Sequence, residues 1–150
     1  MESKVASFSA KTWNATFNDT TLEKTDAFKS DKVWLALSIW TSASDLLCIC
    51  YGQNPKIGEY LEGRVKHFKT SDVVRSTQSI SFTKLIKDYG FRVLTITKTP
   101  EKLRELIGLK SKTLLKVLIL DKIDTLTTFK EPYFRNKKEK LVSGYNLSQD

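Results

Sequence analysis

Two cysteines and one histidine are the side chains of this 150-residue sequence best suited to metal binding or nucleophilic catalysis. Cys48, Cys50 and His67 supply three ligands in all, whereas a structural zinc site usually needs four nitrogen or sulfur ligands. Cysteine catalysis needs a base within hydrogen-bonding distance, and His67 instead lies in a lysine- and arginine-rich segment that suits contact with an anion. We therefore expect both cysteines to be small hydrophobic residues of a buried strand, and we predict no metal ligand and no catalytic residue.

An apolar run that ends in aspartate is a second pattern with chemical potential. Residues 117–124, Val-Leu-Ile-Leu-Asp-Lys-Ile-Asp, are typical of the strand that helps to hold Mg²⁺ in nucleotide hydrolases. Those enzymes also need a Gly-x-x-x-x-Gly-Lys-Ser/Thr phosphate loop, which the sequence does not contain, since Gly108–Thr113 lacks the second glycine. The aspartates are therefore expected to start a turn, and we predict no cofactor.

Two basic clusters remain as candidate binding sites. Residues 60–69 have the alternation of a strand, which would project Arg64, Lys66 and Phe68 from one surface. Two cations beside an aromatic ring suit phosphate neutralisation and stacking on an unpaired base. Residues 133–140 repeat this mixture, and lysines between 98 and 116 would extend the positive field. The predicted nucleic-acid-binding residues are Arg64, Lys66, Phe68, Lys69, Lys110, Lys112, Arg135, Lys137 and Lys138.

The charge balance favours an anionic partner. The chain has 25 lysine and arginine residues against 17 aspartate and glutamate residues, which gives a net charge of +8 and an isoelectric point near 9.5. Residues 1–50 hold five basic and six acidic side chains, so the positive excess lies wholly in residues 51–150. A field of this sign concentrates polyanions. The alternative is that the charge serves solubility alone and that lysine stems cover apolar surface.

The apolar segments and the cysteines exclude several classes of protein. No apolar stretch of signal-peptide length lies in the first thirty residues, so we do not expect secretion. The longest apolar run, residues 33–40, is far shorter than the roughly 20 residues of a membrane helix. Two cysteines two positions apart on a strand do not favour a disulfide. We expect an intracellular protein, cytoplasmic or nuclear, with no transmembrane segment, and the charge leaves peripheral contact with an anionic membrane open.

The hydrophobic fraction of 40% and the chain length suit one domain of the α+β class. Residues 33–40 and 46–51 are apolar on both faces and are separated by a polar five-residue gap, which predicts a central hairpin. Helices near residues 80–89 and 100–107 are expected to cover one face of the sheet. We expect a mainly antiparallel sheet with strands near residues 5–17, 33–40, 46–51, 60–69, 91–97 and 114–120.

The two predicted helices have defined start and stop residues. Apolar residues recur at helical spacing from Phe82 to Tyr89, and Gly90 follows where a left-handed residue ends a helix. Thr99-Pro100 predicts the start of the second helix, and Gly108 its end. Residues 91–120 then form a strand–helix–strand unit, which would join parallel strands by a right-handed crossover.

The segment 113–126 allows either a strand or a helix. Its charged residues scatter around a helical wheel, and the lack of a clean polar face favours a buried strand. Residues 1–126 make up the predicted domain, and residues 127–150 a basic C-terminal extension with some flexibility.

From these patterns we expect a non-enzymatic nucleic-acid-binding protein, with RNA or single strands favoured, that acts by phosphate neutralisation and aromatic stacking. The alternative is a self-assembling structural protein, such as a coat, matrix or complex subunit, whose basic face meets a nucleic acid or an anionic membrane. Trp13, Trp34 and Trp40 would then anchor contacts between copies. A third class is an enzyme whose catalytic residues come together only on folding.

Overall fold

The computed structural model describes residues 2–18, 22–70 and 77–129, and of residues 22 and 66–70 it describes the backbone alone. The strands are β1 (Glu2–Ser7), β2 (Asn14–Phe17), β3 (Leu35–Ser42), β4 (Asp45–Gly52), β5 (Gln78–Ser81), β6 (Arg92–Thr95) and β7 (Ile123–Thr125). The helices are α1 (Leu22–Ala27), α2 (Lys56–Thr70), α3 (Phe82–Tyr89), α4 (Pro100–Lys110) and α5 (Lys112–Val117), with a 3₁₀ turn, η1, at Leu120–Lys122.

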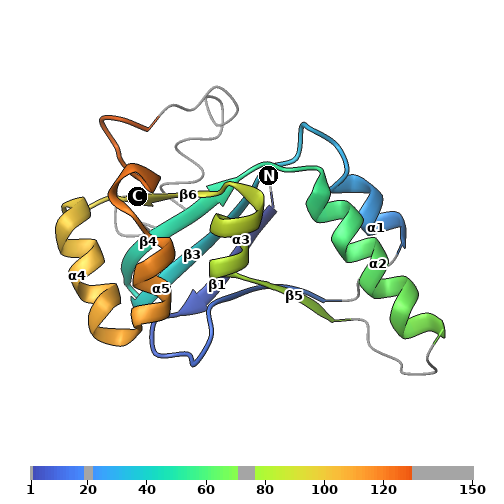
Figure 1. Cartoon of the computed structure of the whole chain (residues 1–150), viewed down its shortest axis with the longest axis horizontal. Coiled ribbons are helices and arrows are strands. Elements are labelled where there is room, and N and C mark those ends of the chain that lie inside the picture. Colours follow the sequence, from blue (N-terminus) through green and yellow to red (C-terminus); the bar gives the residue numbers. More distant parts are fainter. Residues whose placement is uncertain (1, 19–21, 71–76, 130–150) are drawn as a thin grey trace.

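A five-stranded sheet in the order β1–β3–β4–β6–β7 forms the centre of the molecule (Figure 1). β4 pairs in antiparallel with β3 and with β6, whereas β1 is parallel to β3 and β7 is parallel to β6. β2 and β5 form a separate antiparallel ribbon. Within the described ranges, three of the five strand pairs are therefore antiparallel, and the predicted α+β class is confirmed.

The helices cover one face of the sheet. Figure 1 shows α3 and α5 in front of the sheet, α4 at its left end and the α1–α2 pair at the right. The hairpin of β3 and β4 is buried on both faces, so its predicted central position is confirmed. The helix-covered core includes Leu35, Leu37, Ile39, Cys48, Cys50, Phe82, Leu85, Ile86, Phe91, Val93, Leu103 and Ile107. The opposite face carries a smaller cluster of Ala36, Leu46, Ile49, Tyr51, Leu94 and Phe129.

The predicted stop of the first helix at Gly90 and the predicted start of the second at Thr99-Pro100 are confirmed. Ser81 precedes α3 and its Oγ accepts a hydrogen bond from the Lys84 N–H at 3.1 Å, while Gly90 ends the helix with φ 71°. Thr99 caps α4 in the same way, with Pro100 in the first turn.

The predicted end of α4 at Gly108 is wrong, because the helix continues to Lys110. Gly108 does not end the helix, and its role is to allow close packing against the next helix. A Cβ at this position would lie 3.0 Å from Cδ2 of Leu115, so glycine allows α5 to approach α4 closely.

Residues 60–69 belong to α2, and the predicted strand there is wrong. Asn54 Oδ1 accepts a hydrogen bond from the Lys56 N–H at 3.0 Å, which starts the helix. Ile57 and Leu61 are four residues apart and both are buried, which gives the segment an apolar stripe of helical spacing. The glutamate, lysine and arginine residues of this segment also have high helix propensity. These helix-favouring features outweigh the short alternation of side chains that predicted a strand.

The strand predicted at residues 114–120 is also wrong. Residues 112–117 form α5, and the strand that pairs with β6 is β7 at Ile123–Thr125. A central strand needs continuous burial, yet Ile119 and Leu120 remain 46% and 47% exposed. The parallel pairing expected of the strand–helix–strand unit is confirmed, with its second strand later in the chain.

The single strand predicted at residues 5–17 is two strands, β1 and β2, in different sheets. The chain leaves the main sheet after Ser7, where the Ala10 N–H donates to the Ser7 carbonyl oxygen at 3.0 Å and closes a turn. The loop that results brings Trp13 into the core, where it is 2% exposed.

We expect Gly63→Ala and Gly52→Ala to change the free energy of unfolding in opposite directions. Gly63 lies on the exposed side of α2 with no neighbour within 4 Å of an added Cβ, so alanine should stabilise the protein by about 0.5–1 kcal/mol. A Cβ at Gly52 would lie 2.5 Å from Cδ1 of the buried Phe91 ring, so alanine should destabilise it by about 1–3 kcal/mol. Urea unfolding followed by circular dichroism measures both changes, and equal effects of the two substitutions would contradict the packing described.

Candidate nucleic-acid interface

α2 carries the first group of predicted binding residues. Arg64 is exposed there, while the side chains of Lys66, Phe68 and Lys69 lie outside the described part of the chain. The prediction that Arg64, Lys66 and Phe68 share one surface assumed a strand, in which alternate residues point the same way. In a helix with 3.6 residues per turn, alternate residues are about 200° apart. The argument for that shared surface therefore no longer holds.

Lys110 and Lys112 form the second group, at the junction of α4 and α5. Lys112 is exposed, and the Nζ of Lys110 lies 5.2 Å from the ring centre of Phe8. The third group, Arg135, Lys137 and Lys138, lies outside the residues that the structure describes.

A groove of about 310 Å³ lies beside Lys110, between the β1–β2 loop, the start of α3 and the α4–α5 junction. It brings Lys11 to the same opening as Lys110, although the two residues lie at opposite ends of the described chain. Sequence patterns do not indicate Lys11, because it is an isolated lysine in a polar loop. The groove is lined by Lys11, Thr12, Trp13, Ser81, Phe82, Thr83, Lys110, Ser111, Thr113 and Leu114.

Hydrogen bonds and ring contacts hold these three segments in place. The Phe82 N–H donates to the Trp13 carbonyl oxygen at 2.7 Å, which ties the β1–β2 loop to the start of α3. The Trp13 indole meets Phe82 edge-on, with ring centres 5.1 Å apart, and its Nε1 donates to the Phe8 carbonyl oxygen at 3.2 Å. Ser111 caps α5 by accepting from the Leu114 N–H at 3.2 Å. The groove thus has an ordered, largely apolar floor beneath a polar rim.

The charge of the two lysines that line the groove, Lys11 and Lys110, and of the neighbouring Lys112 is not balanced locally. No ion pair among the described residues includes Lys11, Lys110 or Lys112. Elsewhere lysines do have acidic partners, as in the pair of Lys29 with Glu62 at 2.6 Å. Aspartate and glutamate are absent from the three stretches that surround the groove, residues 3–18, 77–87 and 106–120. The residues that line the groove therefore carry positive charge and no negative charge.

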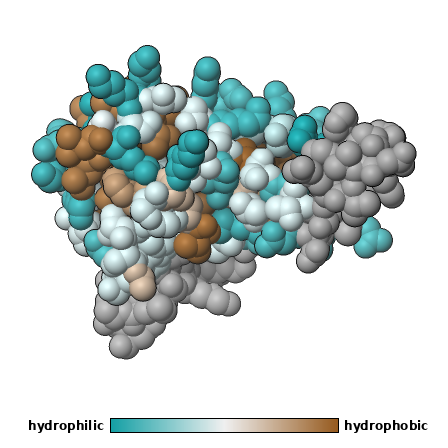
Figure 2. Space-filling view, turned by 90° about the horizontal axis from the view of Figure 1, so that it is seen from below, coloured by the Kyte–Doolittle hydropathy of each residue, from teal (hydrophilic) through white to brown (hydrophobic). Residues whose placement is uncertain are grey.

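Figure 2 shows the molecule from below. Hydrophilic side chains and hydrophobic patches lie next to one another at the left of this view, which is the side of α4 in Figure 1. Leu109, beside Lys110, is 80% exposed and accounts for part of the apolar surface in this region. The combination of lysines, hydroxyl groups and apolar surface suits contact with phosphates and with the less polar parts of a nucleotide.

The aspartate that ends the segment 117–124 has structural partners. Asp124 accepts two hydrogen bonds from the Arg92 guanidinium, at 2.8 and 2.9 Å, and a third from the Tyr51 hydroxyl. Burial favours a higher pKa for Asp124, but the bonds from Arg92 and Tyr51 outweigh it and hold the pKa below its usual value. Burial, and then the bond to Asp124, raises the pKa of the Tyr51 phenol. At neutral pH this group is an ionised carboxylate held by two donors, which suits structural pairing and not proton transfer.

The cysteines lie in the core and are not poised to react. Cys48 and Cys50 are free, fully buried thiols on the helix-covered face of β4. Burial raises the pKa of both thiols, whereas a reactive cysteine needs an accessible thiolate. Among the residues that the structure describes, no three histidine, cysteine, aspartate or glutamate side chains are grouped as metal ligands. In the same part of the chain, every helix is too short or too polar to cross a lipid bilayer.

Comparison with known proteins gives no relative: no protein-family model matches the chain, and neither the curated proteins nor the solved structures contain a match.

We expect Asp124→Asn to lower the free energy of unfolding at pH 7 by about 1–3 kcal/mol, because it removes the charge that satisfies Arg92. The pKa of Asp124 is lower in the folded protein than its unfolded value of about 3.9, so its contribution is present above that pH and disappears as the pH falls through the folded pKa. The variant and the parent should therefore converge in strongly acidic solution. Urea unfolding between pH 2 and pH 7 measures the difference.

Asp88→Asn is the matched control for this experiment. Asp88 pairs with Lys84 across one helical turn at 3.1 Å, and its side chain is 46% exposed. Its removal should cost no more than about 0.5 kcal/mol. Equal losses at the two positions, or a pH-independent loss at Asp124, would contradict the pairing described.

Proposed function

We propose that the protein is a non-enzymatic nucleic-acid-binding protein that contacts phosphates through Lys11, Lys110 and Lys112. The observation that carries this proposal is the convergence of Lys11 and Lys110, which have no acidic partners among the described residues, on a groove surrounded by carboxylate-free segments. Phosphate neutralisation by lysine supplies most of the affinity of proteins that bind nucleic acids without sequence selection. The hydroxyl groups of the rim add donors for phosphate oxygens.

RNA or single strands are the favoured form of this ligand. Phe8 is half-buried beside the groove and one face of its ring carries the Lys110 ammonium at 5.2 Å. When Lys110 turns to a phosphate, that ring face becomes available to an unpaired base. A duplex keeps its bases stacked and offers no such contact, so we expect it to bind more weakly at equal charge.

We expect the triple variant Lys11→Gln, Lys110→Gln, Lys112→Gln to bind a fluorescein-labelled 20-nucleotide oligouridylate at least about tenfold more weakly than the parent at 50 mM salt. The slope of log affinity against log salt should also become shallower, by roughly 0.7 for each phosphate that the variant no longer neutralises. Fluorescence anisotropy between 50 and 200 mM potassium chloride measures both quantities, and a 20-base-pair duplex RNA tests the preference for single strands.

A control variant with the same net charge distinguishes a defined surface from overall charge. Lys32, Lys56 and Lys87 are exposed, and none of them lines the groove. Their combined replacement by glutamine should leave most of the affinity intact. Equal losses in the two triple variants would show that the charge acts only in bulk, and salt-independent binding by the parent would overturn the proposal.

The alternative is a self-assembling structural protein with Trp13, Trp34 and Trp40 as anchors between copies. One of these three tryptophans is buried and is not available for such a contact. Trp13 is 2% exposed and packs in the core, so it does not meet a neighbouring copy. Trp34 and Trp40 are half-buried on the opposite face of the sheet. Light scattering at increasing protein concentration tests this alternative, since a constant monomer mass would contradict it.

A further inference from the structure

The groove beside Lys110 is small for a site that binds a strand along its length. Its volume of about 310 Å³ lies at the lower end of the range of about 300–1,000 Å³ that is usual for small-molecule sites. Proteins that follow a single strand along its backbone cover about 4–16 nucleotides in an open channel. A groove of this size accommodates one nucleotide, so the remainder of a bound strand must lie outside it.

Two lysines from different walls line this groove. Lys11 comes from the β1–β2 loop and Lys110 from the end of α4. Neither forms an ion pair with a described residue, and the contact of Lys110 with the Phe8 ring at 5.2 Å is weaker than a charge-assisted hydrogen bond. Two ammonium groups are therefore available to a ligand that occupies the space of a single nucleotide.

Hydroxyl groups make up most of the remaining polar lining, on Thr12, Ser81, Thr83, Ser111 and Thr113. The Thr12 hydroxyl accepts from the Asn14 amide at 3.2 Å, and the two serines accept from backbone N–H groups as helix caps. A hydroxyl that accepts one hydrogen bond keeps its own hydrogen for another acceptor. Thr83 and Thr113 form no side-chain hydrogen bond with any residue that the structure describes. The lining thus offers several donors to an anion.

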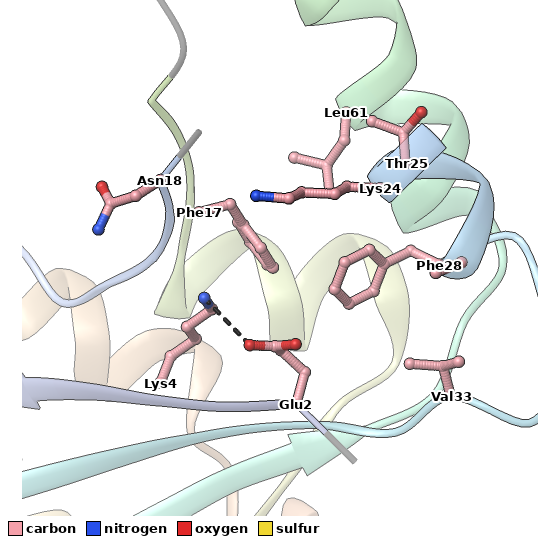
Figure 3. Close-up of a pocket in the computed structure, with 10 residues that line it drawn as sticks. Glu2, Lys4, Phe17, Asn18, Lys24, Thr25, Phe28, Val33 and Leu61 are labelled. Atoms are coloured by element: carbon pink, nitrogen blue, oxygen red, sulfur yellow. Dashed lines mark ion pairs between the residues drawn. The ribbon is translucent and has the colours of Figure 1, made fainter. Parts of the chain in front are cut away.

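A larger cavity, of about 480 Å³, lies between β1 and the α1–α2 pair and differs in charge (Figure 3). Its lining includes Glu2, whose Oε1 lies 3.2 Å from the Nζ of Lys4. This carboxylate neutralises the lysine and would repel an anionic ligand. The groove beside Lys110 has no carboxylate among its described lining residues, so it suits a ligand with more than one negative charge.

Phosphates at the end of a strand differ from those within it. An internal phosphate is a diester with a single negative charge. A terminal phosphate is a monoester, which carries a charge of about −1.5 to −2 at neutral pH and three strong acceptor oxygens. The monoester therefore gains more than the diester from two lysines and neighbouring hydroxyl donors in one small space.

We propose that the groove binds the terminal nucleotide of a single strand through its phosphate monoester. This inference rests on the nucleic-acid-binding function proposed above and names the chemical group that the groove selects. The phosphate oxygens would accept hydrogen bonds from the ammonium groups of Lys11 and Lys110 and from the Thr113 hydroxyl. Lys112, which is exposed beside the groove, is then available to the next phosphate of the strand.

The test compares hexauridylate with a 5′-phosphate, hexauridylate with a 3′-phosphate, and heptauridylate with hydroxyl groups at both ends. The heptamer has one more internal phosphate, so its charge matches that of the phosphorylated hexamers to within about one unit. Competition against the labelled oligouridylate, followed by anisotropy at about 50 mM potassium chloride, measures the three affinities. We expect one phosphorylated hexamer to bind roughly fivefold to tenfold more tightly than the heptamer, and that hexamer identifies the end of the strand.

Three variants test which residues produce this preference. Lys11→Gln combined with Lys110→Gln should reduce the ratio of the two affinities to about one, because it removes both cations. Thr113→Val keeps the net charge and should lower the ratio roughly twofold to threefold through the loss of one donor. Lys32→Gln combined with Lys56→Gln, outside the lining, should leave the ratio unchanged. A ratio measured on one sample is insensitive to a misfolded fraction of the protein.

The 5′- and 3′-monophosphates of uridine locate the site in the parent protein. In ¹H–¹⁵N correlation spectra of the full chain, one of them should cause saturable shifts at residues 11–13, 81–83 and 110–114. Uridine itself, at the same concentration, should cause no shifts there. Shifts that lie only outside these residues would contradict the proposed site.

The inference is overturned if all three strands bind the parent equally, or if the preference survives in the double variant of Lys11 and Lys110. Equal binding that still depends on these two lysines would leave the proposed nucleic-acid function in place and assign the groove to internal phosphates. A parent protein that binds none of the strands would overturn the proposed function together with this inference.

Discussion

Burial of the β3–β4 hairpin on both faces is the constraint from which the rest of the structure follows. Its residues from Leu35 to Ile39 and from Leu46 to Tyr51 have almost no exposed surface, so both faces must be covered by other parts of the chain. The helices cover one face of the hairpin, where Leu85 and Leu103 belong to the core. The strands β1 and β6 flank the hairpin, and the sheet ends at β1 on one side and at β7 on the other.

Charged side chains are consequently found around the edges of the core. They differ in whether a side chain of opposite charge lies close to them. At the β6–β7 edge the Arg92 guanidinium and Asp124 neutralise one another, and the pair fixes the last strand to the sheet. At the end formed by the β1–β2 loop and the α4–α5 junction, Lys11 and Lys110 have no such partners among the described residues. Charge that is balanced internally contributes to stability, whereas unbalanced charge is available to a ligand. This difference is the reason for placing the interface at the second end.

Local patterns predicted those parts of the fold in which one interaction dominates. The cap at Thr99 and the left-handed Gly90 act over one turn, so the sequence predicts them without tertiary information. Residues 60–69 and 114–120 were misassigned because their alternation and apolar runs fit a strand and a helix equally well. There the choice depends on which side chains the core can bury, and that is decided by long-range packing.

The sequence by itself determined the α+β class, the central hairpin, the burial of Cys48 and Cys50 in a strand, and the positive charge of residues 51–150. These properties follow from composition and from contacts between near neighbours. Only the tertiary structure decided that Lys11 and Lys110 line the same groove. The residues of this groove come from segments that are far apart in the chain. The packing of the sheet and helices brings them together, and the local spacing of residues in the sequence does not predict this.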